Sequence, residues 1–238
     1  IHTVDAMLPA AGSLAIRERL ARQDPANALR QHALSVSHDR IGDVLSARGD
    51  LQGAHAAFQA SLAISERLAR QDPGNAQWQR ALAVAHEKIG NVLRAGGHLP
   101  GALEAFRASL VIAEQLARRD PGNAELQRDI SVSLERIGDV LRAQGDLPRA
   151  LSAFRTGHEI AERLARQDPG NAERQGDLAA SHGKIGQALA AQGATAEARQ
   201  SFEAGRAIVA DLLRRYPDWA LWRRYLAGFD RELARLPK

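Results

Sequence analysis

Residues 136–147 read RIGDVLRAQGDL, and this phrase occurs four times in a chain of 238 residues. The other copies are RIGDVLSARGDL from Arg40, KIGNVLRAGGHL from Lys88 and the more divergent KIGQALAAQGAT from Lys184. The two Gly-Asp pairs are compatible with a phosphate or metal loop. A phosphate loop, however, needs clustered glycines before a helix N-terminus, whereas the first glycine of each copy falls inside an expected helix. The phrase therefore predicts a joint at which two helices approach closely.

A single step of 48 residues organises the whole chain, with no insertion anywhere. The positions that follow this step are Ile41, Ile89, Ile137 and Ile185; Gly42, Gly90, Gly138 and Gly186; Phe58, Phe106, Phe154 and Phe202; and the turns at Asp24-Pro25, Asp72-Pro73, Asp120-Pro121 and Asp168-Pro169. Repetition at a fixed period of this length predicts a solenoid, in which each unit buries its apolar face against its neighbours.

Each unit predicts two helices. The first runs from Asn75 to Ala95, with Asn75 as the N-cap and Gly97 ending it in a left-handed conformation. The second runs from about Leu99 to Arg118, with Pro100 in its first turn, where a missing N–H does no harm. The expected N-caps of other second helices are Asp50 and Asp146.

The two ends of the chain keep the same register. Residues from Leu14 copy a second helix, while residues 1–13 keep only Ala6 and Ser13 of the pattern and are expected to be linker. The segment from Trp219 to Leu236 aligns with a first helix. We expect a single array of about ten helices, divided into a partial repeat at 1–26, repeats at 27–74, 75–122, 123–170 and 171–218, and a terminal capping helix at 219–238.

These motifs resemble the tetratricopeptide repeat, whose pattern places Leu-Gly in the first helix and Ala, three spacers and Phe in the second. Here Ile41-Gly42 is followed by Ala54 and Phe58, and four copies lie in phase. The resemblance covers nearly the whole chain and implies an all-α, right-handed solenoid of antiparallel helix hairpins. The family repeat is about 34 residues long. Fourteen further residues divide evenly between the two helices, which should each be roughly 30 Å long at about 1.5 Å per residue.

Composition excludes several classes of site. The chain contains no cysteine, so disulfides, thiolate metal sites and cysteine nucleophiles are absent. Thirty-two basic and 28 acidic residues leave a net charge of only +4, a weak argument for nucleic acid. No apolar run approaches the roughly 20 residues that span a bilayer. The chain begins at Ile1, which suggests a fragment or processed product and makes a missing signal peptide uninformative; we expect a cytoplasmic location.

No catalytic, cofactor or metal constellation is expected. His38, His86 and His182 recur at one position, with Leu134 as the fourth member, but units about 10 Å apart cannot supply ligands about 2 Å from one zinc ion. They are interpreted as packing histidines. The letters Ser37-His38-Asp39 cannot form a triad, because consecutive helical residues point in different directions.

The remaining candidate is a polar stripe on the first helices. The resemblance implies that these helices line the concave face, and the stripe was expected to be exposed. Its asparagine, aspartate and glutamine positions could hydrogen-bond the backbone of an extended peptide, or the stripe could be only a solvated face. The basic clamp for a C-terminal carboxylate is not matched. The candidate partner-binding residues are Asp39, Arg40, Asp43, Arg80, Glu87, Lys88, Asn91, Arg94, Arg128, Glu135, Arg136, Asp139, Arg142, Lys184 and Gln187.

The sequence therefore favours a non-enzymatic protein- or peptide-binding scaffold or sensor module of a larger bacterial protein, as the resemblance implies. An alternative is structural self-association, end to end, through the truncated first pair and the aromatic residues Trp219, Trp222, Tyr225 and Phe229. Nucleic-acid binding through Arg80, Arg94, Arg128 and Arg142 ranks last, because acids interleave with these arginines.

Overall fold

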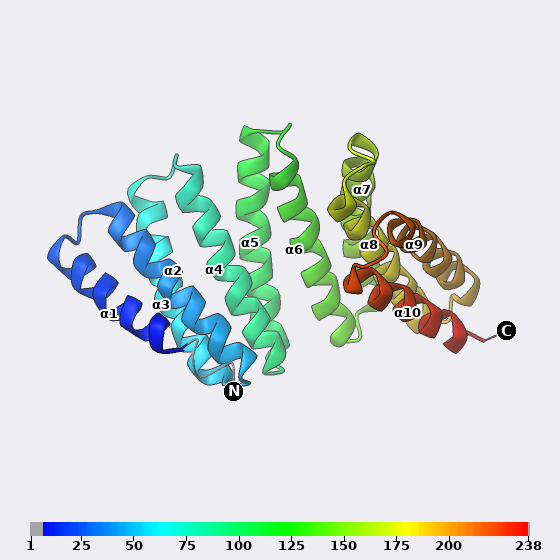
Figure 1. The fold of residues 1–238 in the computed structure, drawn as a ribbon, viewed down its shortest axis with the longest axis horizontal. Coiled ribbons are helices and arrows are strands. Elements are labelled where there is room, and N and C mark those ends of the chain that lie inside the picture. The colour runs from blue at the N-terminus through cyan, green and yellow to red at the C-terminus, as the bar shows by residue number, and fades with distance from the viewer. Residues whose placement is uncertain (1–6, 238) are drawn as a thin grey trace. The chain divides into compact units, whose positions relative to one another are not determined.

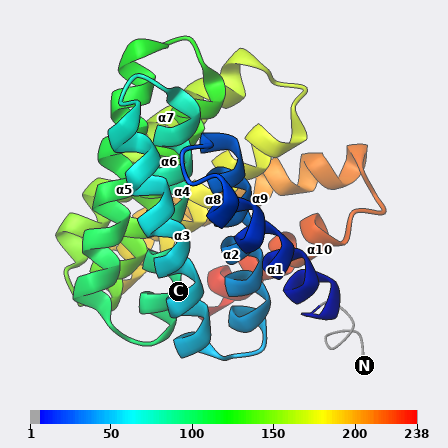
Figure 2. The same cartoon turned by 90° about the vertical axis from the view of Figure 1, so that its left-hand side faces the viewer.

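The structure of the protein, a computed structural model, describes residues 7–237 and shows an all-α fold, with no strand among them. Its helices form two compact units, Ile1–Asp120 and Pro121–Lys238, each a series of antiparallel helices packed in chain order (Figures 1 and 2). The first unit holds α1 (Met7–Gln23), α2 (Ala28–Ala47), α3 (Leu51–Gln71), α4 (Ala76–Ala95) and α5 (Leu99–Arg119). The second holds α6 (Ala124–Ala143), α7 (Leu147–Gln167), α8 (Ala172–Ala191), α9 (Thr195–Arg215) and α10 (Ala220–Arg235).

The even-numbered helices are the first helices of the repeat and the odd-numbered ones are the second helices. The four whole first helices are 20 residues long and the second helices from α3 to α9 are 21. At about 1.5 Å per residue both kinds measure about 30 Å, so the predicted lengthening of both helices is confirmed. Residues 7–13 were expected to be linker, but α1 already begins at Met7. The part of that expectation concerning residues 1–6, including Ala6, lies outside the described residues.

The predicted caps and turns are present. The Asn75 side chain accepts hydrogen bonds from the backbone N–H groups of Gln77 and Trp78, and Asp50 accepts one from Gly53, so each satisfies donors that a helix start leaves free. Gly97 closes the hairpin between α4 and α5 with φ of +79°, a backbone conformation that side chains disfavour.

Each hairpin is joined by a phenylalanine ring that lies on the mid-helix glycine. In the hairpin of α4 and α5, a Cβ added to Gly90 would lie 2.7 Å from Cε1 of Phe106, closer than any normal contact. The same relation holds for Gly42 and Phe58, Gly138 and Phe154, and Gly186 and Phe202. The glycines are therefore needed for close approach of two helices, as the sequence predicted.

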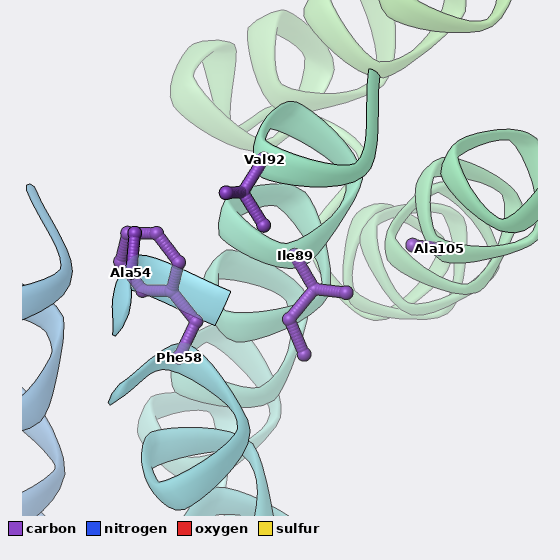
Figure 3. Close-up of a cluster of buried hydrophobic side chains, with 5 residues drawn as sticks. All are labelled: Ala54, Phe58, Ile89, Val92 and Ala105. Carbon is purple, nitrogen blue, oxygen red and sulfur yellow. The ribbon is translucent and has the colours of Figure 1, made fainter. Parts of the chain in front are cut away.

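Alanines and branched side chains complete the core around each ring. In the first unit, Ala54 and Phe58 of α3 face Ile89 and Val92 of α4, with Ala105 of α5 beside them (Figure 3). Burying each large side chain is worth about 1.5–3 kcal/mol, and the stability of the unit accumulates from one hairpin to the next.

The terminal helix α10 is held by two aromatic side chains that were expected to be exposed. Trp222 and Phe229 are only 4 % and 7 % exposed, so the prediction that they form aromatic surface is wrong. Trp222 lies where a Cβ of Gly176 would be, and Phe229 where a Cβ of Gly205 would be. These two glycines, on α8 and α9, therefore create the sites that fix α10.

We predict that Gly90→Ala destabilises the protein by about 1–2 kcal/mol, measured by urea unfolding. The added methyl would overpack the ring of Phe106 at a cost of about 1–3 kcal/mol, against a gain in helix propensity of up to about 1 kcal/mol. In a Phe106→Leu background the added cost should largely disappear. Gly228→Ala is the matched control, because its nearest neighbour would be 4.0 Å away; it should stabilise or leave stability unchanged. Equal losses for Gly90→Ala and Gly228→Ala would contradict the close-approach role.

Candidate partner-binding face

The predicted polar stripe lies on the first helices, but most of it is half-buried rather than exposed. Only Arg40, Asp43 and Arg80 of the predicted set are exposed, and Asp139 is buried, with 7 % of its surface accessible. The partly buried members are Asp39, Glu87, Lys88, Asn91, Arg94, Arg128, Glu135, Arg136, Arg142, Lys184 and Gln187. The expectation that Asp139 is left free for a partner is therefore wrong.

Ion pairs between successive first helices account for part of this stripe. In the first unit, Lys88 of α4 donates to Asp43 of α2 over 2.5 Å between Nζ and Oδ1. In the second unit, Lys184 of α8 donates to both carboxylate oxygens of Asp139 on α6, at 2.7 and 2.8 Å. Each pair links residues 45 positions apart, so the charges join neighbouring hairpins rather than turns of one helix.

Arg128 makes a third link between first helices. Its Nε donates to Asp177 over 2.5 Å, and its Nη2 lies 2.9 Å from Oε1 of Glu173, both on α8. The hydrogen bond with Asp177 raises the pKa of the Arg128 guanidinium further above its ordinary value. The side chain is thus engaged in holding α6 to α8. In the same unit Arg142 lies 3.8 Å from Asp139.

Burial perturbs two carboxyl groups of the stripe. It raises the pKa of Glu135 to about 7, although neighbouring Lys184 acts in the opposite direction. It also raises the pKa of Asp39. A carboxyl that titrates close to neutrality is a weaker ion-pair partner, so Glu135 contributes less negative charge to this face than its sequence suggests.

The repeated histidines are partly buried in the packing between helices. Burial lowers the pKa values of His38 and His86, and it lowers the pKa of His182 to about 4, with neighbouring His158 contributing. The rings of His158 and His182 meet edge to face with centroids 4.5 Å apart. Among the described residues, no three His, Asp or Glu side chains gather closely enough to hold a metal ion.

A groove opens in the second unit between α8 and α10, above Phe202 of α9. Its volume is about 390 Å³. The lining residues are Ala180, Gly183, Lys184, Gln187, Phe202, Arg224, Tyr225, Gly228, Phe229, Arg231 and Glu232. Two of these, Lys184 and Gln187, belong to the predicted stripe, so the stripe continues into this groove.

Small residues create this groove. Gly183 stands where the preceding repeat has Glu135, and Ala180 stands where it has Val132. On the opposite wall, Gly228 continues the position of Ala180 one further repeat along. Three positions that could carry larger side chains therefore hold only glycine or alanine, which leaves the space open. The rings of Phe202 and Phe229 form the floor of the groove.

The sequence interpretation missed the contribution of α10 to this face. It treated the terminal helix as a cap and named none of its residues as part of the stripe, yet Arg224 and Arg231 line the groove. A signal was available, because Arg224 occupies the repeat position of Arg80 and Arg128, two residues already in the predicted stripe. The register of the stripe therefore extends into the last helix.

The tetratricopeptide repeat family model matches residues 39–72. This segment is a tetratricopeptide repeat. The segment contains Ala54 and Phe58, on which the predicted resemblance was based, so the resemblance is confirmed. Its helices recur along the chain at intervals of 48 residues. No curated protein sequence shows significant similarity to the chain.

Solved structures with helical repeats share the fold. BtubC (BKLC) from P. vanneervenii matches with a TM-score of 0.67 and 16 % identity, over 98 % of this chain and 87 % of that one. The apo form of RapI matches with a TM-score of 0.65 and 14 % identity, over 96 % and 75 % of the two chains. A putative kinesin light chain with nearly identical tetratricopeptide-like repeats from P. anserina matches with a TM-score of 0.58 and 16 % identity, over 86 % and 89 %. The all-α solenoid class predicted from the sequence is confirmed, and the low identities show the fold alone.

Asp139→Ala is expected to destabilise the protein by about 2 kcal/mol, because it removes the partner of a half-buried lysine. The matched change in the first unit, Asp43→Ala, should cost less than about 1 kcal/mol, since that carboxylate is half exposed. Urea unfolding of both variants measures the difference. Equal effects at the two sites would show that burial of Asp139 does not determine the strength of its pair.

The His182→Leu variant should gain stability relative to the wild type as the pH falls, because leucine cannot titrate; Leu134 occupies the same repeat position. The folded protein protonates His182 only near pH 4, while the unfolded chain does so near 6.5. The contribution of the neutral His182 ring to the free energy of unfolding is therefore complete above pH 6.5 and is lost as the pH falls toward 4. The difference in unfolding free energy between His182→Leu and the wild type should shift in favour of the variant by about 1 kcal/mol from pH 7.5 to pH 5, after allowance for the partial exposure of the ring. Urea unfolding at both pH values measures this shift. A difference that stays constant with pH would refute the assignment.

Proposed function

We propose that this chain is a non-enzymatic protein-binding module that holds a segment of a partner against its first helices. The chain is a tetratricopeptide-like repeat scaffold, a class that generally mediates interactions between proteins. The observation that carries the proposal is the groove between α8 and α10, where the predicted residues Lys184 and Gln187 border an apolar floor. An apolar floor bordered by a few polar groups is what a peptide side chain and its backbone require.

The polar residues in register along the first helices support the same use. Asn91 and Gln187 occupy one repeat position, and both side chains are partly accessible. An amide side chain offers a donor and an acceptor together, which matches the backbone of an extended peptide. The aspartates at the same position, Asp43 and Asp139, instead pair with lysines of the next first helix. The amide positions are therefore better candidates for backbone recognition than the acidic ones.

The charges of the stripe give less support to nucleic-acid binding. Arg128 is paired with Asp177 and Glu173, and Arg142 lies beside Asp139. A surface that binds phosphates by charge needs arginines that are free to pair with them, which releases the counterions held by the nucleic acid. Within residues 7–237, no helix is both long and apolar enough to span a membrane.

The proposal is tested by selecting binders to the whole chain from a library of random peptides displayed on phage. The selected peptides should bind Asn91→Ala or Gln187→Ala roughly three- to tenfold more weakly, the effect of losing one hydrogen bond, with no change in melting temperature. Gln200→Ala is the matched control, because Gln200 is exposed on the second helix α9. A selection that yields no binder, or binders weakened equally by Gln200→Ala, would contradict recognition by the first helices.

A further inference from the structure

The groove between α8 and α10 carries an excess of positive charge. Of its charged residues, Lys184 is neutralised by Asp139, and Glu232 lies 3.7 Å from Arg235 on the same helix. Arg224 and Arg231 are exposed and make no hydrogen bond or ion pair within the described part of the chain. Two full positive charges therefore remain at its rim.

Several other arginines of the second unit pair with acids. Arg206 of α9 donates to Asp230 of α10 over 2.6 Å, and Arg214 of α9 donates to Asp211 over 2.6 Å. Arg128, at the repeat position of Arg224, has two acidic partners on the next first helix. Arg224 thus differs from Arg128 in lacking an acid, rather than in its place on the helix, whereas Arg231 introduces a positive charge where earlier repeats carry Glu87 and Glu135.

The floor between these arginines is apolar. Phe202 and Phe229 are 1 % and 7 % exposed and meet edge to face with centroids 6.5 Å apart, and Tyr225 borders them. An aliphatic or aromatic side chain entering the groove would pack on Tyr225, which is partly exposed, and would itself be removed from water above these two rings. The ligand must therefore bring an apolar group together with negative charge.

The spacing of the two arginines sets the form of that ligand. They are seven residues apart on α10, which is nearly two turns, so they lie on one face about 10.5 Å apart along the helix axis. A peptide in the polyproline II conformation rises about 3.1 Å per residue with three residues per turn, so side chains three positions apart lie on one face about 9 Å apart. One small anion would meet both guanidinium groups only if the two side chains folded toward each other, whereas two acidic side chains on one peptide can meet them at this spacing.

We propose that the groove binds an acidic segment of a partner protein, in which two acidic residues about three positions apart pair with Arg224 and Arg231 while an apolar side chain between them lies on Phe202, Tyr225 and Phe229. This inference rests on the proposed function and specifies its ligand. The charge pairs set the orientation and the selectivity of the segment, and the apolar side chain supplies most of the contact area.

The test uses two synthetic peptides blocked at both ends, so that neither carries a terminal carboxylate. One is Ala-Asp-Leu-Ala-Asp-Ala and the other has Asn in place of both Asp. Each is titrated into the nitrogen-15-labelled whole chain, and the backbone and arginine Nε signals are followed by NMR. The Asp peptide should shift signals of α8 and α10 around the groove, and the Asn peptide should bind roughly tenfold more weakly. Binding of the Asp peptide should also weaken as salt is added.

The double variant Arg224→Gln/Arg231→Gln should weaken binding of the Asp peptide roughly tenfold. Both side chains are exposed, so the spectrum of the variant should otherwise remain that of the folded protein. Its matched control is Arg107→Gln/Arg118→Gln, which makes the same change in net charge at exposed positions of α5. That control should bind the peptide as the wild type does.

Equal binding of the two peptides, shifts confined to other helices, no shifts at all, or equal losses in both double variants would each overturn the inference. The phage selection separates this failure from that of the proposed function. Selected binders that are sensitive to Gln187→Ala but carry no acidic residues would overturn the acidic ligand and leave the binding module intact. Binders that respond to no first-helix change would overturn both.

Discussion

The contact between a phenylalanine ring and a glycine in the middle of the facing helix holds each hairpin of this protein together. It brings the two helices closer than any side chain at the glycine position would allow, and the surrounding alanines and branched residues pack against the ring. Because the contact recurs every 48 residues, the first helices of a unit keep one orientation, and equivalent polar side chains fall on the same face. The stripe and the groove therefore depend on this apolar contact.

Most of the fold could be predicted from the sequence, because its determinants are local. Asn75 and Gly97 mark the ends of α4 by their own conformational preferences, and the period of the apolar residues sets the helix faces. The same local logic failed for Asp139. Its burial is caused by Lys184 on another helix, and a polar residue on an expected helix surface carries no sign of such a partner.

The candidate site was harder to predict, because a hollow results from residues that are small. The sequence analysis assigned no role to Gly183 or Gly228, whereas in the structure they leave room for the groove. Lys184 and Gln187 were named, since the stripe could be followed by counting, and Arg224 could have been found by the same count. That two rim arginines lack acids depends on the spatial arrangement of several helices, which no single helix pattern shows.

Nearly identical repeats face a danger during folding, since any second helix can pair with the wrong first helix and trap a shifted arrangement. The contact between Trp222 and Gly176 reduces part of this danger. Gly176 stands where earlier repeats carry Arg80 and Arg128, whose long side chains would occupy the space of the indole. The divergence of the last whole repeat thus favours pairing of α10 with α8 over these shifted pairings.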